Sequence, residues 1–251
     1  MPKHNYEVLH KDLVEIAKLK SDPIGIKLFE ELRSDLPYIN KNLALCQVMK
    51  LASIYGRTVG ISADNIDACV IGTHILGFRE LPENYYRKWM TLRKMPEEIA
   101  KSVIANIHTL PMGKYKSGVL APLKKFNELN IDPDAVIMMA NSAQTYLLLV
   151  GFFDSSGIKP KSDFNGHAAC EILATVTKGE SPWLTIPCGG ARGLAEAQDD
   201  ELWIGMTVEH LNASLTRLKS VGSKYPPPVY QILMTPPIQE HSLTLLIGRT
   251  S

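Results

Sequence analysis

Two kinds of segment alternate along the chain, and this alternation most limits the folds available to it. Short apolar segments, such as Ile24–Phe29 and Ala135–Ala140, are separated by longer amphipathic segments such as residues 42–55. Short apolar runs favour strands, whereas apolar residues spaced near the helical period favour helices. Residues 136–139 are apolar on both sides of the pleat, as in a strand covered on both faces. The sequence therefore predicts one compact α/β domain over residues 1–251, with a mixed sheet flanked by helices and a core at about residues 10–220.

The remaining elements follow from the same periodicities. Further strands are expected at residues 58–62, 183–186, 200–206 and 243–247, and the last of these could also dock a second copy in a homodimer. Helices are expected at residues 10–20, 70–76, 83–108, 121–128, 145–153, 166–178 and 208–220. The charged segment 83–108 is expected to be a surface excursion with a second helix start at Pro96.

Charge and hydropathy exclude several classes of partner. The chain has 27 Lys and Arg against 26 Asp and Glu, so its net charge of +1 creates no broad field for nucleic acid or anionic membrane. The longest apolar stretch is interrupted by Asn141, Ser142 and Gln144, which makes it too polar to span a bilayer. No secretory leader is recognisable at the N-terminus. We expect a cytoplasmic protein, in which cysteines more often bind metal or do chemistry than form disulfides.

The four cysteines, Cys46, Cys69, Cys170 and Cys188, are the main candidates for a working site. Their spacing contains no Cys-x-x-Cys pair, and their number alone is compatible with simple core filling. Local context favours a joint site. Cys46 and Cys69 lie near expected helix starts, where N–H groups favour thiolate. Cys188 precedes Gly189 and Gly190, which are expected to form a turn that allows positive φ and directs N–H groups at an anion.

Thiolate ligands select zinc or an iron–sulfur cluster over magnesium or calcium. Zinc sites commonly include a close ligand pair, so four dispersed cysteines fit one [4Fe-4S] cluster better, used for electron transfer or a reductive reaction on a small molecule. Zinc remains the alternative. His167 lies three residues before Cys170 in the helix expected at residues 166–178, so it could replace a thiol or donate to one.

Two other functions are compatible with the same residues. Cys188 could be a nucleophile, with the N–H groups of Gly189 and Gly190 holding an oxyanion and His74 or His167 as base. Arg192 could bind a carboxylate or phosphate beside this turn, or form a salt bridge with Glu196 or Asp200. The chain could instead be a non-enzymatic small-molecule or structural-zinc protein. Fingerprints of dinucleotide, P-loop and serine-hydrolase sites are absent, although a flavin remains open.

Several of these segments together resemble a known prokaryotic family. Residues 23–27 (Pro-Ile-Gly-Ile-Lys), Cys46-Gln47, Asp67-Ala-Cys69 with Gly72, and residues 188–192 (Cys-Gly-Gly-Ala-Arg) are similar in order and spacing to domain of unknown function 169. The resemblance extends over about residues 10–220. It implies that the cysteines fall on family motif positions and that the host is an anaerobe or archaeon. It implies no substrate, so the redox partner or small molecule stays unspecified.

Overall fold

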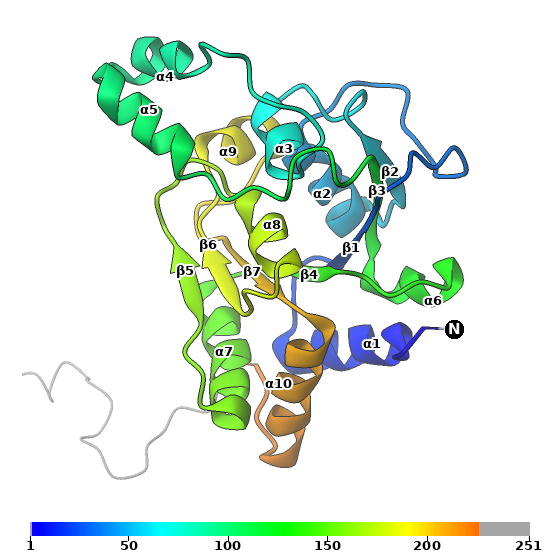
Figure 1. Cartoon of the computed structure of the whole chain (residues 1–251). Helices are drawn as coiled ribbons and strands as arrows, with labels where there is room; N and C mark the ends of the chain where they lie inside the picture. Colours follow the sequence, from blue (N-terminus) through cyan, green and yellow to red (C-terminus); the bar gives the residue numbers. More distant parts are fainter. Residues whose placement is uncertain (1, 226–251) are drawn as a thin grey trace, which may run out of the picture.

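The computed structural model describes residues 2–225, and its strands form a single seven-stranded sheet (Figure 1). Their order is β2-β3-β1-β4-β7-β6-β5, and all neighbours are antiparallel except β5 and β6. The α/β fold with a mixed sheet is therefore confirmed. The strands are β1 (Ile24–Phe29), β2 (Val59–Ser62), β3 (Ser117–Pro122), β4 (Ala135–Ala140), β5 (Lys161–Asp163), β6 (Trp183–Thr185) and β7 (Leu202–Met206).

The sheet separates two hydrophobic cores, and the central strand β4 supplies both. Ala135, Ile137 and Met139 point into one core, whereas Val136, Met138 and Ala140 point into the other. This follows from the two-residue period of a strand. The double-faced apolar pattern predicted for residues 136–139 is confirmed, because both faces of β4 are covered.

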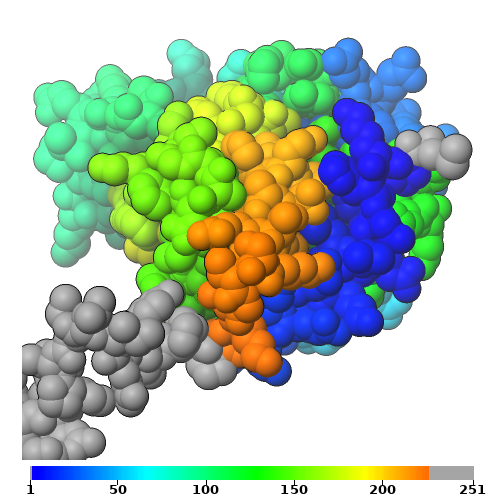
Figure 2. All heavy atoms as spheres, turned by 90° about the horizontal axis from the view of Figure 1, so that it is seen from below, coloured from blue at the N-terminus to red at the C-terminus, as the bar shows by residue number. Residues whose placement is uncertain are grey.

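Helices cover the two faces unequally. One face carries α2 (Leu45–Tyr55), α3 (Val70–Ile75), α8 (Glu171–Thr177) and α9 (Gly189–Ala195). The opposite face carries α1 (Tyr6–Ala17), α7 (Ser142–Ser156) and α10 (Val208–Ser220), which lie side by side in Figure 2. The remaining helical segments are α4 (Tyr86–Arg93), α5 (Glu97–Ala105), η1 (Leu123–Lys125) and α6 (Phe126–Leu129), of which α4 and α5 form the expected excursion (Figure 1).

Polar side chains at the helix starts fix several of these elements. Asn141 caps α7 by accepting the N–H of Gln144, and the Gln144 side chain accepts the N–H of Asn141 in return. Thr207 caps α10 in the same way through the N–H of His210. Among the described helices, none combines the length and apolar character needed to cross a bilayer.

Three expectations about elements were wrong or fall outside the structure. β3 was not expected because Gly118 and Pro122 are unusual within a strand. Gly118 is needed there, since a Cβ would lie 2.9 Å from the backbone oxygen of Lys27. The helix expected at 121–128 begins later, because β3 continues through Pro122. The helix expected at 166–178 begins only at Glu171. The strand expected at 243–247 lies outside the described residues.

Candidate functional site

All four cysteines line one cavity of about 220 Å³, which we call the cysteine pocket. All four are free thiols, and Cys46 and Cys170 are buried. Most of the wall is apolar, and two cationic side chains, Lys88 and Arg93, lie on the side formed by α4. The other lining residues are Leu45, Ile71, Gly72, Tyr85, Trp89, Leu92, His167, Ala168, Gly190 and Ala191.

Each cysteine lies at the start of a helix on the same face of the sheet. Cys46 is the second residue of α2, while Cys69, Cys170 and Cys188 immediately precede α3, α8 and α9. The first N–H groups of a helix have no partner within it, so they favour negative charge nearby. The sulfur of Cys188 accepts one of them, the N–H of Ala191, at 3.4 Å. The helix-start positions predicted for Cys46 and Cys69 are confirmed, and Cys170 and Cys188 share them.

The thiols are near enough to affect one another's ionisation. Interaction with the Cys170 thiol lowers the pKa of Cys46, and the N–H of Gln47 acts in the same direction. The same contact, together with burial, raises the pKa of Cys170. Burial also raises the pKa of Cys69. Of these three thiols, Cys46 is therefore the one most inclined to become thiolate.

The sulfur atoms are nevertheless too far apart for one small ion. Within residues 2–225, no three of them lie within 4.8 Å of one another. A tetrahedral zinc ion with Zn–S bonds of about 2.3 Å would hold its sulfur ligands roughly 3.8 Å apart. The pocket in this form is thus wider than a single zinc ion requires.

Residues of α4 and His167 form another part of the pocket wall. The His167 ring lies 4.8 Å from the Trp89 ring, and the Arg93 guanidinium lies 5.4 Å from the Trp89 ring centroid. His167 Nδ1 is buried and has no hydrogen-bond partner in the described part of the chain. Burial and the positive charge of Arg93 lower the pKa of His167, which favours neutral imidazole. His167 lines the pocket as proposed, but it precedes α8 instead of sharing a helix face with Cys170.

The predicted turn after Cys188 is a helix instead. Gly189 and Gly190 are the first residues of α9 and have negative φ, because extended Cys188 leads directly into right-handed helix. Gly190 lines the pocket, and Gly189 lies near Arg93. Arg192 does not line the pocket. Its guanidinium pairs with Asp199 at 2.9 Å, and not with Glu196 or Asp200 as expected, and it also donates to the carbonyls of Pro187 and Gln198.

His74, one of the two candidate bases, lies outside the cysteine pocket. Its Nδ1 is 4.0 Å from Glu80 Oε2, and its ring is not part of the pocket wall. His167 is thus the candidate base that accompanies the cysteines.

A second group of possible metal ligands was not predicted from the sequence. One ligand atom each from His108, Asp163 and Glu171 lies within 4.8 Å of the others. Glu171 is 3% exposed, and its carboxylate accepts the N–H of His108 at 3.0 Å. Burial raises the pKa of Glu171 to about 7. The three residues come from separate segments, so no local pattern indicates them.

The comparisons with known proteins agree with the resemblance. A family model described as uncharacterised ArCR, domain of unknown function 169, matches residues 12–217. The chain belongs to this family. The region matched by domain of unknown function 169 includes all four cysteines and every described strand. No curated protein and no solved structure gives a significant match.

Proposed function

We propose that the chain holds one [4Fe-4S] cluster through Cys46, Cys69, Cys170 and Cys188, and uses it for electron transfer or a reductive reaction on a small molecule. The observation that carries the proposal is that four cysteines from four helix starts line a single pocket. Convergence of all the cysteines of a chain on one cavity exceeds what core filling requires.

The donor set and its spacing support a cluster over zinc. Thiolates are the ligands that iron–sulfur clusters take from proteins, and a cluster is larger than one ion, so it needs sulfur atoms that are further apart. Among the described residues, no three of the sulfurs lie within 4.8 Å of one another, whereas a zinc site holds all of its sulfur ligands closer than this. Structural zinc in a non-enzymatic protein therefore remains the second candidate for the same four ligands.

The surrounding residues suit a group with negative charge. Lys88 and Arg93 line the pocket and would offset the charge of four thiolates, while buried Leu45 and Ile71 would keep water from the ligands. When bound, such a cluster would supply a one-electron couple whose potential depends on these contacts. His167, with an unpartnered Nδ1, could donate to or replace a thiolate ligand.

A cysteine nucleophile is less well supported. His74, one of its two candidate bases, lies outside the cysteine pocket, and the glycines after Cys188 form a helix instead of the expected turn. The N–H groups of Gly189 and Gly190 still belong to the first turn of α9, so an oxyanion contact there remains chemically reasonable. We propose that a protein with this cluster works in a reducing cytoplasm and acts with an unidentified redox partner or small molecule. Homodimer formation also stays a proposal.

Metal analysis of anaerobically purified protein tests the proposal. We expect about four iron atoms per chain and visible absorbance from thiolate–iron bonds. Replacement of any one cysteine by serine should remove most of both signals, because each supplies one ligand. Ala52→Ser is a matched control, since it adds a hydroxyl within α2 at a buried position outside the pocket and should keep the iron.

Three outcomes would contradict the cluster. One colourless zinc ion per chain would favour the structural-zinc protein. Metal-free protein in which only Cys188 is alkylated, with protection by a substrate analogue, would favour the nucleophile. Metal-free protein with four equally inert thiols would leave the cysteines as core residues.

A further inference from the structure

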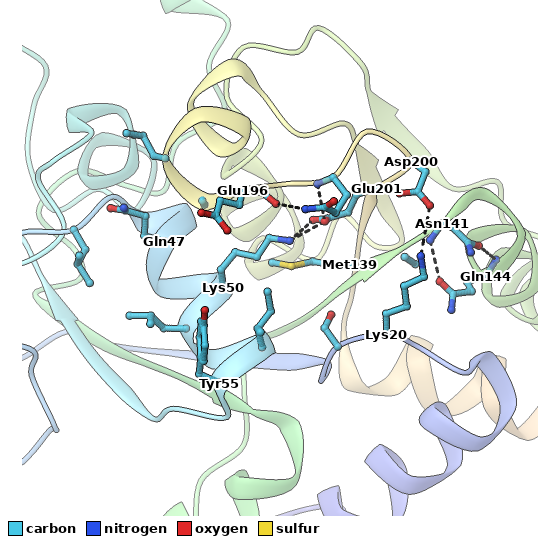
Figure 3. Close-up of a pocket in the computed structure, with 18 residues that line it drawn as sticks. Lys20, Gln47, Lys50, Tyr55, Met139, Asn141, Gln144, Glu196, Asp200 and Glu201 are labelled. Carbon is cyan, nitrogen blue, oxygen red and sulfur yellow. Dashed lines mark hydrogen bonds and ion pairs between the residues drawn. The ribbon is translucent and has the colours of Figure 1, made fainter.

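A second and larger cavity, of about 430 Å³, is drawn in Figure 3. We call it the lysine pocket, after Lys50 at its base. α2 and α9 contribute to both cavities. Their first residues line the cysteine pocket, whereas Lys50, Leu51, Leu194 and Ala195 from the following turns line the lysine pocket. A volume of this size suits a small organic molecule, for which sites of roughly 300–1,000 Å³ are typical.

Lys50 and Glu201 form a buried ion pair that points into this cavity (Figure 3). The side chains are 10% and 9% exposed, and Lys50 Nζ lies 2.9 Å and 2.7 Å from the two carboxylate oxygens. Glu201 also accepts the indole N–H of Trp203 at 2.6 Å and the N–H of Gln198 at 3.2 Å. These donors occupy the acceptor sites of the carboxylate, which has about four.

The hydrogen-bond donors of the Lys50 ammonium group are less completely paired than the acceptor sites of Glu201. An ammonium has three N–H donors, and Glu201 takes two of them. Within residues 2–225 Lys50 Nζ makes no other hydrogen bond, so one of its donors is left for a ligand in the cavity. A buried charged donor gains most from an acceptor that enters with a ligand, because water is largely excluded there.

Part of the cavity wall is formed by large apolar side chains that are exposed within residues 2–225. Ile54 and Tyr55 in α2 are 56% and 69% exposed, and Leu194 in α9 is 46% exposed. All three line the cavity, together with Leu43, Leu51 and Met139. Exposed large apolar side chains that converge on a hollow are typical of a ligand-binding groove.

The charges around the cavity disfavour an anionic ligand. Lys20 and Lys50 contribute two positive charges, whereas Glu196, Asp200 and Glu201 contribute three negative ones. Lys20 and Asp200 also face each other at 3.8 Å near the mouth. A carboxylate ligand would therefore meet a slightly negative site, but an uncharged oxygen acceptor would not.

We propose that the lysine pocket binds an uncharged, mainly apolar small molecule through a carbonyl oxygen that accepts a hydrogen bond from Lys50. The apolar body of this molecule lies on the wall formed by Leu51, Ile54 and Tyr55. The inference goes beyond the proposed cluster and does not depend on it, because none of the cysteines lines this cavity.

Binding of the dye Prodan to the full chain tests the inference. Prodan is an uncharged naphthalene with one ketone oxygen, and its emission moves to longer wavelength when that oxygen accepts a hydrogen bond and to shorter wavelength in apolar surroundings. We expect saturable binding to one site, and weaker binding of the anionic dye anilinonaphthalene sulfonate. The emission maximum, not the intensity, is the measurement, because a coloured cluster would reduce intensity without moving the maximum.

Two kinds of variant locate the dye. Lys50→Met removes the donor and should weaken Prodan binding by about tenfold or more, and should move the emission of bound dye to shorter wavelength. The double variant Lys50→Met/Glu201→Gln should show the same weaker Prodan binding and the same emission shift as Lys50→Met. It also avoids leaving the Glu201 carboxylate buried without its partner. Ile54→Asp should weaken binding by a similar factor. Ile158→Asp is its matched control, because Ile158 is also 56% exposed but lies outside the cavity, and it should bind as wild type does.

Four results would overturn the inference: no saturable Prodan site in the wild-type chain, tighter binding of the sulfonate dye than of Prodan, equal weakening by Ile54→Asp and Ile158→Asp, or unchanged emission in the folded Lys50 variants.

Discussion

Glu171 is an acid buried beside the cysteine pocket, and its environment makes stability depend on pH. It is 3% exposed, and burial raises its pKa from 4.5 to about 7. The folded state therefore holds this proton more tightly than the unfolded state. For such an acid, stability from this group is greatest below the unfolded pKa of 4.5 and falls as pH rises toward the folded pKa of about 7.

Glu171→Gln should remove this dependence in metal-free protein. The free energy of unfolding of the variant, relative to that of wild type, should rise by about 2–3 kcal/mol between about pH 4.5 and about pH 8. The reason is that wild type must bury a charged carboxylate at the higher pH, whereas the amide stays neutral. Urea unfolding at both pH values measures the difference. A difference that does not change with pH would mean that Glu171 is solvated as a carboxylate.

Single residues also show how far sequence reasoning extends. Cys46, Cys69 and Cys188 could be selected because local caps and glycines marked their positions. Lys50 and Glu201 could not, because they are 151 residues apart in sequence and meet only through the packing of α2 near β7. The same holds for Trp89 and Arg93, which reach the cysteine pocket from the excursion.

Among the elements, those with a strong apolar pattern were predictable to the residue. β1 and β4 have the expected bounds, because buried apolar side chains run along both: those of β1 lie in one core and those of β4 lie in both. Elements that depend on tertiary context were not. β3 tolerates Gly118 and Pro122 because β1 and β2 pair with it on both sides, and the glycines of α9 form a helix although glycine disfavours one.

Two glycines in α9 offer a matched pair. In the described part of the chain, a methyl group at Gly193 would meet no atom within 4 Å apart from its chain neighbours and its own helix backbone, whereas one at Gly190 would lie 3.7 Å from Cys188 Sγ, beside the cysteine pocket. Gly193→Ala should stabilise the chain by about 0.5–1 kcal/mol and keep its iron, since alanine favours helix. Gly190→Ala should also fold, but it should retain less iron because the methyl group takes space beside the ligand.

Thermal unfolding and iron content of the two variants, purified anaerobically in parallel, make this comparison. Equal iron in both would show that the space beside Gly190 is not used by a bound group.

At the scale of the whole molecule, the helices that begin at the cysteines lie on one face of the sheet and the second core lies on the other. α2, α3, α8 and α9 contribute the cysteines, while α1, α7 and α10 contribute none. The sheet connects the two sides, because alternate residues of β4 fill both cores. The sequence predicted this layered arrangement from periodicity. It did not predict the strand order, which depends on pairings between distant segments.

This arrangement decides how far the effect of a bound group would spread. A group that binds only folded protein stabilises it by mass action, by about 2.7 kcal/mol at a hundredfold excess over Kd. If residues 2–225 unfold as one unit, as predicted for a single domain, anaerobic reconstitution with iron and sulfide should slow the slowest amide exchange in α7 and α10 as much as in α2. Hydrogen exchange of metal-free and reconstituted protein measures this, with Cys46→Ser as the control that should show no slowing anywhere. Slowing confined to α2, α3, α8 and α9 would instead mean that the two cores open independently, and the single-domain prediction would be wrong.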